Sequence, residues 1–241
     1  MIDTRIANEI VHGKYLSLHG AGEIWNWESP AGQVRWQRRV KILTHAIKDS
    51  YKVLELGCGT GYFTKEIVSS GASITAIDIS PDLLITAKTI VNSPNVQFIE
   101  ENAYAMKFPN ETFDVVVGSS VLHHLDITKA ISEMYRVLKK GGFICFTEPN
   151  MVNPQIALQK NIPWLKRKLG DSPDETAFFR WSLQRKLKKA GFNQIKVRPF
   201  DFLHPAIPPA LIRPVSSIGL FVEKLPLMRE IAGSLIIEAI K

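Results

Sequence analysis

The sequence predicts a single α/β domain built on a doubly wound, mostly parallel sheet with helices on both faces. Short apolar runs alternate with helix-like segments, three glycines follow the first run, and an acidic residue ends the second. Such alternation is typical of parallel sheets, whose strands are joined by crossover helices. A chain of 241 residues with 45% hydrophobic residues can bury a sizeable core in one such domain.

The first predicted strand, Lys52–Leu56, runs into glycines at every second position, Gly57, Gly59 and Gly61. Glycine lets the backbone turn sharply and approach a ligand closely. The helix-like segment that begins at Tyr62 then offers free amide groups to an anionic ligand. A dinucleotide-binding loop would carry its third glycine at the position of Tyr62, so the spacing disfavours a nicotinamide dehydrogenase.

The second predicted strand, Ser73–Asp78, ends in a carboxylate. In a doubly wound sheet, an acid about 20 residues after the glycine loop can accept the ribose hydroxyls of a bound nucleoside. Ser80 and Pro81 follow as the expected N-cap and first residue of a helix. A capping role alone is the alternative for Asp78, and the distance from the glycine loop favours ribose binding.

The segment from Glu55 to Gly61, Glu-Leu-Gly-Cys-Gly-Thr-Gly, resembles the cofactor loop of class I methyltransferases that use S-adenosylmethionine. The similarity is to the methyltransferase type 11, UbiE-like group that acts on small molecules. It continues through residues 50–148 and is thinner over residues 180–197. The resemblance implies a Rossmann-like sheet of seven strands, whose last strand, Ser234–Ile240, pairs antiparallel.

The remaining elements are placed by their apolar periodicity and their glycines. Helices are expected at residues 33–48, 62–70, 128–138 and 182–190, and strands at 96–99, 115–117 and 143–147. We expect Gly141 and Gly142 to stop the third of these helices. The single domain then divides into an N-terminal arm or lid (1–32), a cofactor-binding core (33–148), acceptor-side helices with an insertion around the sixth strand (149–231), and the last strand (232–241).

The resemblance also implies the cofactor, S-adenosylmethionine, and its product, S-adenosylhomocysteine. The glycine loop would hold the methionine end, Asp78 the ribose, and Ile79, Asn102 and Ala103 the adenine. Asn102 replaces the family's usual Asp; its oxygen can still accept a hydrogen bond, although a loop asparagine satisfying its own turn is the alternative. The expected cofactor-binding residues are Glu55, Gly57, Cys58, Gly59, Gly61, Asp78, Ile79, Asn102, Ala103 and Ser119.

Two histidines, His123 and His124, follow the fourth strand, where ligands bind in open parallel sheets. An acceptor hydroxyl must lose its proton as it attacks, and histidine titrates near neutral pH. Glu148, at the end of the fifth strand, is the third catalytic candidate. We prefer His124 as the base, with bracing of the loop as the alternative role for either histidine. We assign no metal ligands.

The regions outside the core are expected to form the acceptor pocket. The arm contains the aromatic residues His12, Tyr15, His19, Trp25 and Trp27, each of which has core packing as its alternative role. Residues 202–228 are apolar and contain five prolines, which argue against one continuous interfacial helix. We expect a small, hydrophobic or lipid- or sugar-linked acceptor with O-methylation favoured, and peripheral contact with a membrane stays open.

Two other functions remain as alternatives, a cofactor- or partner-binding module without turnover and an RNA methyltransferase. The net charge of +7 permits nucleic acid, but we consider it unlikely because the basic clusters at 35–41, 166–168 and 185–189 are expected to be solvated. The loop after the fourth strand lacks the Asn/Asp-Pro-Pro-aromatic pattern of amine methylases. Cys58 and Cys145 are too few for a disulfide framework, and no secretory signal is evident, so a cytoplasmic protein is expected.

Overall fold

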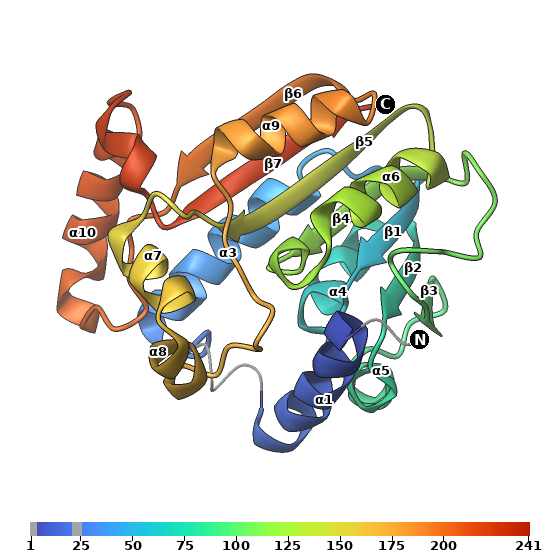
Figure 1. The fold of residues 1–241 in the computed structure, drawn as a ribbon, viewed down its shortest axis with the longest axis horizontal. Coiled ribbons are helices and arrows are strands. Elements are labelled where there is room, and N and C mark those ends of the chain that lie inside the picture. Colours follow the sequence, from blue (N-terminus) through green and yellow to red (C-terminus); the bar gives the residue numbers. More distant parts are fainter. Residues whose placement is uncertain (1–3, 21–25) are drawn as a thin grey trace.

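A seven-stranded sheet runs through the molecule in the order β3-β2-β1-β4-β5-β7-β6 (Figure 1). The computed structural model describes residues 4–20 and 26–241. The strands are β1 Lys52–Leu56, β2 Ser73–Asp78, β3 Val96–Glu100, β4 Phe113–Ser119, β5 Leu138–Pro149, β6 Asn193–Phe200 and β7 Ser234–Ile240. Strands β1 to β5 pair in parallel, and β7 lies antiparallel between β5 and β6. The predicted mostly parallel sheet with an antiparallel last strand is confirmed.

Helices cover both faces of this sheet. One apolar core joins the sheet to α6 and α9 through Ile131, Met134 and Leu183. A second core joins the other face to α3, α4 and α5 and includes Trp36 and Leu84. The helices are α1 Thr4–His19, α3 Pro30–Thr44, α4 Tyr62–Ile67, α5 Pro81–Ile90, α6 Ile127–Val137, α7 Pro154–Asn161, α8 Pro163–Lys168, α9 Arg180–Lys189 and α10 Pro209–Val222, with short turns η1 Val68–Ser70, η2 Leu122–His124 and η3 Met228–Ile231.

The direction of the chain reverses at the centre of the sheet. Strand β1 pairs with β2 on one side and with β4 on the other, so the chain first winds outward to β3 and then returns to β4. Ligands of doubly wound sheets bind beyond the carboxyl ends of the strands at this reversal. The glycine loop follows β1 and the two-histidine turn η2 follows β4, so the two predicted parts of the site meet there.

The start of β5 differs from the prediction. Helix α6 ends at Val137 and β5 begins at Leu138, so the glycines at 141 and 142 lie inside the strand and do not stop the helix. Hydrogen bonds to the C-terminus explain why the two glycines belong to the strand: Gly141 N donates to Lys241 O at 3.0 Å, and Lys241 N donates to Gly142 O at 2.8 Å. Because Lys241 is about 100 residues away in the chain, this pairing cannot be predicted from the sequence around the two glycines.

The N-terminal arm contains a long helix, α1, which packs against α5 (Figure 1). The contact is close because Gly13 has no side chain: a Cβ there would lie 2.5 Å from Ser80 Oγ. Ser80 also caps α5, since its Oγ accepts from Leu83 N. The first core helix, α3, begins at Pro30, three residues before the predicted start, because Ser29 Oγ accepts from Gly32 N at 3.0 Å.

Helix α10 covers residues 209–222 of the proline-containing segment, so residues 202–228 do not form one continuous helix. Pro208 is its N-cap and Pro209 its first residue, positions at which the missing N–H has no helical partner to lose. Pro214 lies inside the helix, and the helix nevertheless continues to Val222. The prolines therefore restrict where the helix begins but do not prevent 14 residues from forming it.

We predict that Gly13→Val displaces α1 from α5, because the added side chain would overlap Ser80. Overpacking of this kind costs about 1–3 kcal/mol, and α1 should become sensitive to protease while the sheet stays folded. Lys14→Val, at an exposed position of the same helix, is the matched control for the lower helix propensity of valine. Equal protease resistance of the Gly13 and Lys14 variants would show that the close contact is unimportant.

Candidate functional site

The glycine loop forms a tight turn between β1 and α4. A Cβ on Gly57 would lie 2.1 Å from Val121 Cγ2, so only glycine allows the loop to approach the turn that follows β4. Gly59 has a φ of +54° and faces open space, and its N–H donates to Asp78 Oδ2 at 2.8 Å. The loop therefore presents bare backbone to a cavity, as the sequence predicted.

The Asp78 carboxylate lies at the end of β2 and joins two segments of the site. Besides Gly59 N, it accepts a hydrogen bond from Ser80 N at 2.9 Å, through Oδ1. Burial raises the pKa of Asp78, although these backbone donors act in the opposite direction. The side chain lines the cavity, so an acid stands beside the glycine loop where a ribose-binding group is expected.

The cavity has a volume of about 580 Å³ and contacts most of the predicted cofactor-binding set. The members at its wall are Gly57, Cys58, Gly59, Asp78, Ile79, Asn102, Ala103 and Ser119. Glu55 and Gly61 lie behind the wall, where Glu55 is 1% exposed and Gly61 caps α4 with a positive φ. Burial raises the pKa of Glu55 to about 8. These two residues can shape the loop but do not line the cavity.

Asn102 satisfies its own turn in this structure. Its Oδ1 accepts from Tyr104 N at 2.9 Å, which is the alternative role considered for it above. The neighbouring Glu101 is also committed to backbone, since it accepts from Asn102 N at 3.0 Å and from Lys107 N at 3.2 Å. Asn102 still lines the cavity, so adenine contact stays a prediction.

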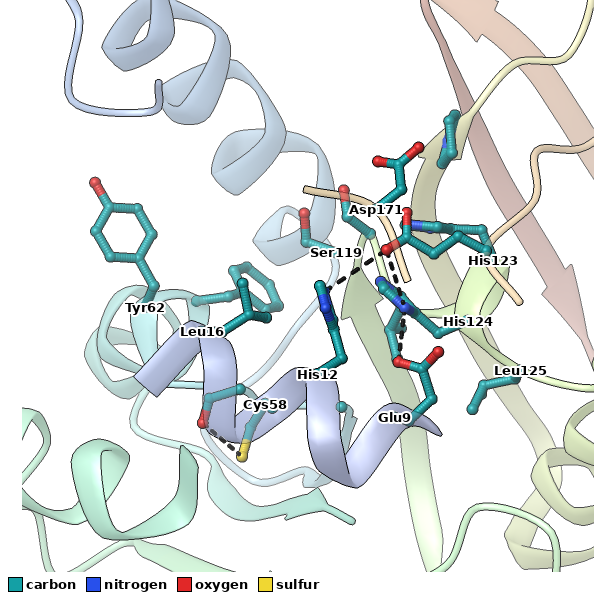
Figure 2. Close-up of a pocket in the computed structure, with 18 of the residues that line it drawn as sticks. Glu9, His12, Leu16, Cys58, Tyr62, Ser119, His123, His124, Leu125 and Asp171 are labelled. Carbon is teal, nitrogen blue, oxygen red and sulfur yellow. Dashed lines mark hydrogen bonds and ion pairs between the residues drawn. The ribbon is translucent and has the colours of Figure 1, made fainter. Parts of the chain in front are cut away.

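The arm and the segment after β5 complete the cavity wall. Helix α1 contributes Glu9, His12 and Leu16. Figure 2 shows Glu9 directed toward His124, and His12 Nε2 lies 3.7 Å from Glu175 Oε1. The later segment adds residues of α7, of the stretch before α9, and of the loop before α10. Trp27 also reaches the cavity, whereas Trp25 lies outside the described residues. The predicted acceptor-side regions therefore lie next to the predicted cofactor site.

Glu148 lies under the histidine turn and not at the cavity wall. Its Oε1 accepts from Val121 N at 2.9 Å and from Leu122 N at 2.7 Å. Its Oε2 is 2.7 Å from His123 Nδ1, so the carboxylate also orients that imidazole. With Nδ1 donating to Glu148, Nε2 of His123 carries the lone pair. Glu148 is thus placed to position His123.

The two histidines have pKa values shifted in opposite directions. Burial and the charge of His124 lower the pKa of His123. Burial also acts to lower the pKa of His124, but the carboxylates of Glu175 and Glu9 raise it to about 9. The Glu9 carboxylate is 2.9 Å from His124 Nδ1. Near neutral pH, His123 is therefore neutral and His124 is a cation.

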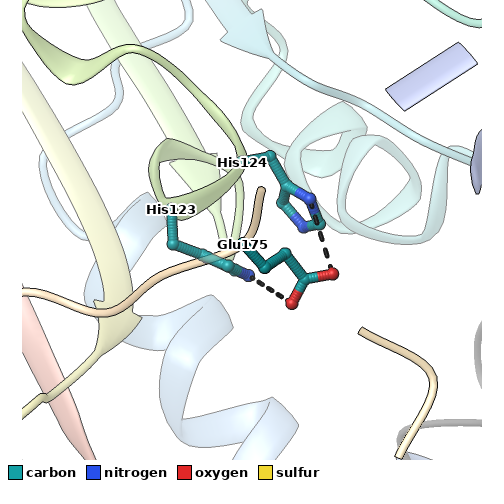
Figure 3. Close-up of side chains that lie close together, drawn as sticks. All are labelled: His123, His124 and Glu175. Atoms are coloured by element: carbon teal, nitrogen blue, oxygen red, sulfur yellow. Dashed lines mark ion pairs between the residues drawn. The ribbon is translucent and has the colours of Figure 1, made fainter. Parts of the chain in front are cut away.

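Glu175 lies between both histidines. Its oxygens are 3.7 Å from His123 Nε2 and 3.7 Å from His124 Nδ1 (Figure 3). It also accepts from Lys160 Nζ at 2.6 Å and from Ser172 N at 2.7 Å. Burial acts to raise the pKa of Glu175, but the cations of His124 and Lys160 hold it well below its usual range.

One potential ligand atom from each of His123, His124 and Glu175 lies within 4.8 Å of the others, so this set could hold a metal ion. The Glu175 carboxylate also pairs with Lys160 Nζ at 2.6 Å, and Lys160 in turn pairs with Asp171 at 2.9 Å. The absence of metal ligands expected from the sequence stays a prediction.

Sequence reasoning did not identify Glu9, Lys160 or Glu175. They lie in three separate segments without a motif, and no spacing relates position 9 or 175 to the histidine turn. Only the hydrogen-bonded stretch before α9, in which Thr176 N donates to His123 O at 3.1 Å, brings Glu175 to this place.

A group of arginines borders the opposite side of the cavity, and here the expectation of a solvated cluster was wrong. Arg39 is 3% exposed and donates to Asp201 Oδ2 at 3.0 Å and to Ser234 Oγ at 2.7 Å. Burial lowers its pKa to about 10. Arg35 pairs with the same Asp201 oxygen at 2.9 Å. These cations tie α3 to the ends of β6 and β7.

Comparison with known proteins agrees with this geometry. A family model described as a methyltransferase domain matches residues 54–146, the stretch that contains the glycine loop, Asp78 and the histidine turn. Residues 54–146 therefore match a methyltransferase domain, in agreement with the class I resemblance of the sequence. A crystal structure of a SAM-dependent methyltransferase from Thermotoga maritima resembles the whole methyltransferase fold, with a TM-score of 0.69 at 18% identity over 95% of this chain and 99% of that one.

Two relatives resemble this chain in sequence. A chloroplastic 2-methyl-6-phytyl-1,4-hydroquinone methyltransferase of Oryza sativa is 34% identical over 61% of this chain and 42% of its own length. A demethylmenaquinone methyltransferase of Staphylococcus epidermidis is 28% identical over 68% of this chain and 77% of its own length. This chain therefore spans less than half of the rice relative. Across residues 4–20 and 26–241, no helix has both the length and the apolar character needed to cross a bilayer.

We predict that the protein loses stability as pH rises from about 6 to about 10. The folded-state pKa of His124, about 9, exceeds its ordinary value of 6.5, so its contribution is complete below about 6.5 and disappears as pH passes about 9. The loss should be at most about 3 kcal/mol, measured by urea unfolding.

His124→Gln should reduce this pH dependence, and His45→Gln, at an exposed histidine, serves as the control. An unchanged pH dependence in the His124 variant would show that its ion pairs do not stabilise the fold.

Proposed function

We propose that the protein is an S-adenosylmethionine-dependent methyltransferase that acts on a hydroxyl-bearing, hydrophobic small molecule. The observation that carries this proposal is one cavity containing both the glycine loop with Asp78 and a neutral histidine oriented by Glu148. The first part fits a sulfonium nucleoside and the second fits removal of an acceptor proton. Methyl transfer needs little more than alignment, exclusion of water and this proton transfer.

In this proposal the cofactor lies along the carboxyl ends of β1, β2 and β4. Asp78 would accept the ribose hydroxyls, and the free space at Gly59 would admit the methionine end. Asn102 would turn its oxygen from Tyr104 N toward the adenine amine, or leave adenine bound by apolar contact with Ile79 and Ala103. Ser119, at the end of β4, would lie near the sulfonium.

His123 is the base that the electrostatics support best, in place of the preferred His124. At neutral pH its Nε2 is free to accept a proton, whereas His124 already carries one. After transfer, the imidazolium of His123 would be stabilised by Glu148 and by Glu175 at 3.7 Å. The His124 cation would stabilise the negative charge that develops on the acceptor oxygen.

The acceptor side of the cavity combines these charges with apolar surface. Leu16, Trp27 and Ile156 line it together with the loop before α10. The rice relative is named for a hydroquinone with a phytyl chain, and the staphylococcal relative for demethylmenaquinone. A phenolic acceptor with an apolar substituent would suit both parts of this wall, and O-methylation is the reaction favoured.

A binding module without turnover is the second candidate, because the Asn102 oxygen is occupied by its own turn. Calorimetric titration with S-adenosylmethionine, S-adenosylhomocysteine and NAD separates the candidates. The enzyme should bind both sulfur nucleosides in the micromolar range and not NAD, and should then methylate a member of a panel of hydrophobic phenols and prenylated compounds. Binding without methylation of any acceptor would favour the module, and binding of neither nucleoside would contradict both.

We predict that Asp78→Ala weakens S-adenosylmethionine binding about 100-fold, because it removes two charge-assisted hydrogen bonds, worth about 3 kcal/mol together. Titration calorimetry measures the change. Asp114→Ala is the matched control, since Asp114 is also a strand carboxylate but lies near the opposite end of β4 and accepts from Lys52 N and Lys139 Nζ. Unchanged affinity in the Asp78 variant would exclude the ribose assignment.

We predict that His123→Asn lowers kcat by about 10²- to 10⁴-fold while leaving cofactor affinity intact, because the proton acceptor is lost. Glu148→Gln should lower kcat less and shift the acidic limb of the pH–rate profile, since it changes only the partner of Nδ1. His124→Asn is the comparison that tests the two histidines against each other. A larger loss of kcat in the His124 variant than in the His123 variant would identify His124 as the base.

A further inference from the structure

Helix α10 presents an apolar face to solvent. Leu211, Ile218 and Phe221 are 50%, 63% and 62% exposed, and with Pro214 they follow the three- and four-residue spacing of one helical face. The helix contacts the rest of the protein on another face, where Gly219 is buried against Phe202. The exposed face is therefore additional to the one that packs.

The apolar surface continues beyond the helix. Leu225, Leu227, Met228 and Ile231 are 38%, 87%, 49% and 41% exposed. Single exposed apolar residues are normal, but a continuous set on one segment marks an interaction surface. We call residues 209–231 the α10 surface.

Charge on the α10 surface is positive where it faces solvent. Arg213 and Lys224 are exposed, and α10 itself contains no acidic residue. The two acidic residues of the segment form ion pairs with other parts of the protein: Glu223 with Arg38, at 2.5 Å, and Glu230 with Arg180, at 2.7 Å. Apolar side chains flanked by cations match the surface of a bilayer that contains anionic lipid.

The position of α10 is fixed from within. Arg38 donates to both carboxylate oxygens of Glu223, at 2.7 and 2.5 Å, and Glu223 also accepts from Asp201 N at 2.9 Å. These contacts connect the end of α10 to α3 and to the end of β6. The apolar face is held outward by a preformed anchor and needs no rearrangement to contact a partner.

The loop that leads into the α10 surface forms part of the cavity wall. His204, Pro205 and Ala206, which lie just before α10, line the cavity. His204 Nε2 is 2.9 Å from Gln155 Nε2 of α7, so the loop is held against the other acceptor-side segment. Figure 1 shows α10 and α7 at the same end of the molecule. A molecule held at the α10 surface would lie close to the acceptor side of the cavity.

We propose that the α10 surface docks the protein on a lipid bilayer that contains anionic lipids. Leu211, Ile218 and Phe221 enter the region between headgroups and acyl chains, while Arg213 and Lys224 contact lipid phosphates. Docking on a bilayer does not depend on the proposed function. Its consequence, delivery of a membrane-held acceptor to the cavity, does rest on the proposed function.

The test is sedimentation of the full chain with vesicles of phosphatidylcholine alone and with phosphatidylglycerol added. We expect the protein to bind the anionic vesicles, to bind neutral vesicles much less, and to be released by salt. Ile218→Ser/Phe221→Ser should lower the partition coefficient about tenfold or more, because two apolar side chains no longer enter the bilayer. Arg213→Glu/Lys224→Glu should remove the preference for anionic vesicles.

Ile85→Ser is the matched control, because Ile85 is 65% exposed on α5, outside the α10 surface. It should bind vesicles as the unchanged protein does. Cofactor titration of each variant, measured without vesicles, reports separately on the proposed function. Absence of vesicle binding, or equal binding by the Ile218/Phe221 variant, would overturn the proposal, as would concentration-dependent dimerisation that this variant abolishes in the absence of any lipid binding.

Discussion

The Glu148 carboxylate, buried at the end of β5, is the group on which the site depends. It accepts hydrogen bonds from the backbone of Val121 and Leu122 and from the His123 ring. A buried carboxylate without such partners would be strongly destabilising, so the loop after β4 has little freedom to adopt another shape. The same loop brings Val121 against Gly57, and the glycine loop is thereby fixed from the opposite side.

The charged groups around this loop shift the pKa values of the neighbouring His123 and His124 in opposite directions. Glu9 and Glu175 keep His124 protonated, and the resulting cation helps to keep His123 neutral. Neighbouring titratable groups with separated pKa values are a common way to obtain a base and an electrostatic stabiliser in one site. Because Glu9 belongs to α1 and Glu175 to the stretch before α9, this separation exists only when both segments close over the sheet.

The sequence predicted the features that are formed by residues close together in the chain, and it missed those that depend on contacts between distant segments. The glycine loop and Asp78 were recognised because their signals are local: a strand, a turn and a charged end lie within a few residues. The antiparallel β7 was expected from the family resemblance alone. The place of Gly141 and Gly142 in β5 was missed because their partner is the distant Lys241. Glu175 was missed because hydrogen bonds to distant segments place it. The buried Arg39 was misjudged for the same reason, since its partners are Asp201 and Ser234.

The prolines of the 202–228 segment indicated that it is not one continuous helix, and their positions explain where α10 begins. Two of them occupy the start of α10, where proline is tolerated, and the sequence alone does not reveal which side of the helix the protein covers. The structure shows that the anchor is polar, through Glu223 and Arg38, and that packing uses the small Gly219. Helix α10 therefore does not need Leu211, Ile218 or Phe221 for attachment to the fold, and exposing them to water has no structural benefit. Their exposure on one face, close in the chain to the cavity-lining residues His204, Pro205 and Ala206, is what the proposed contact with a bilayer would account for.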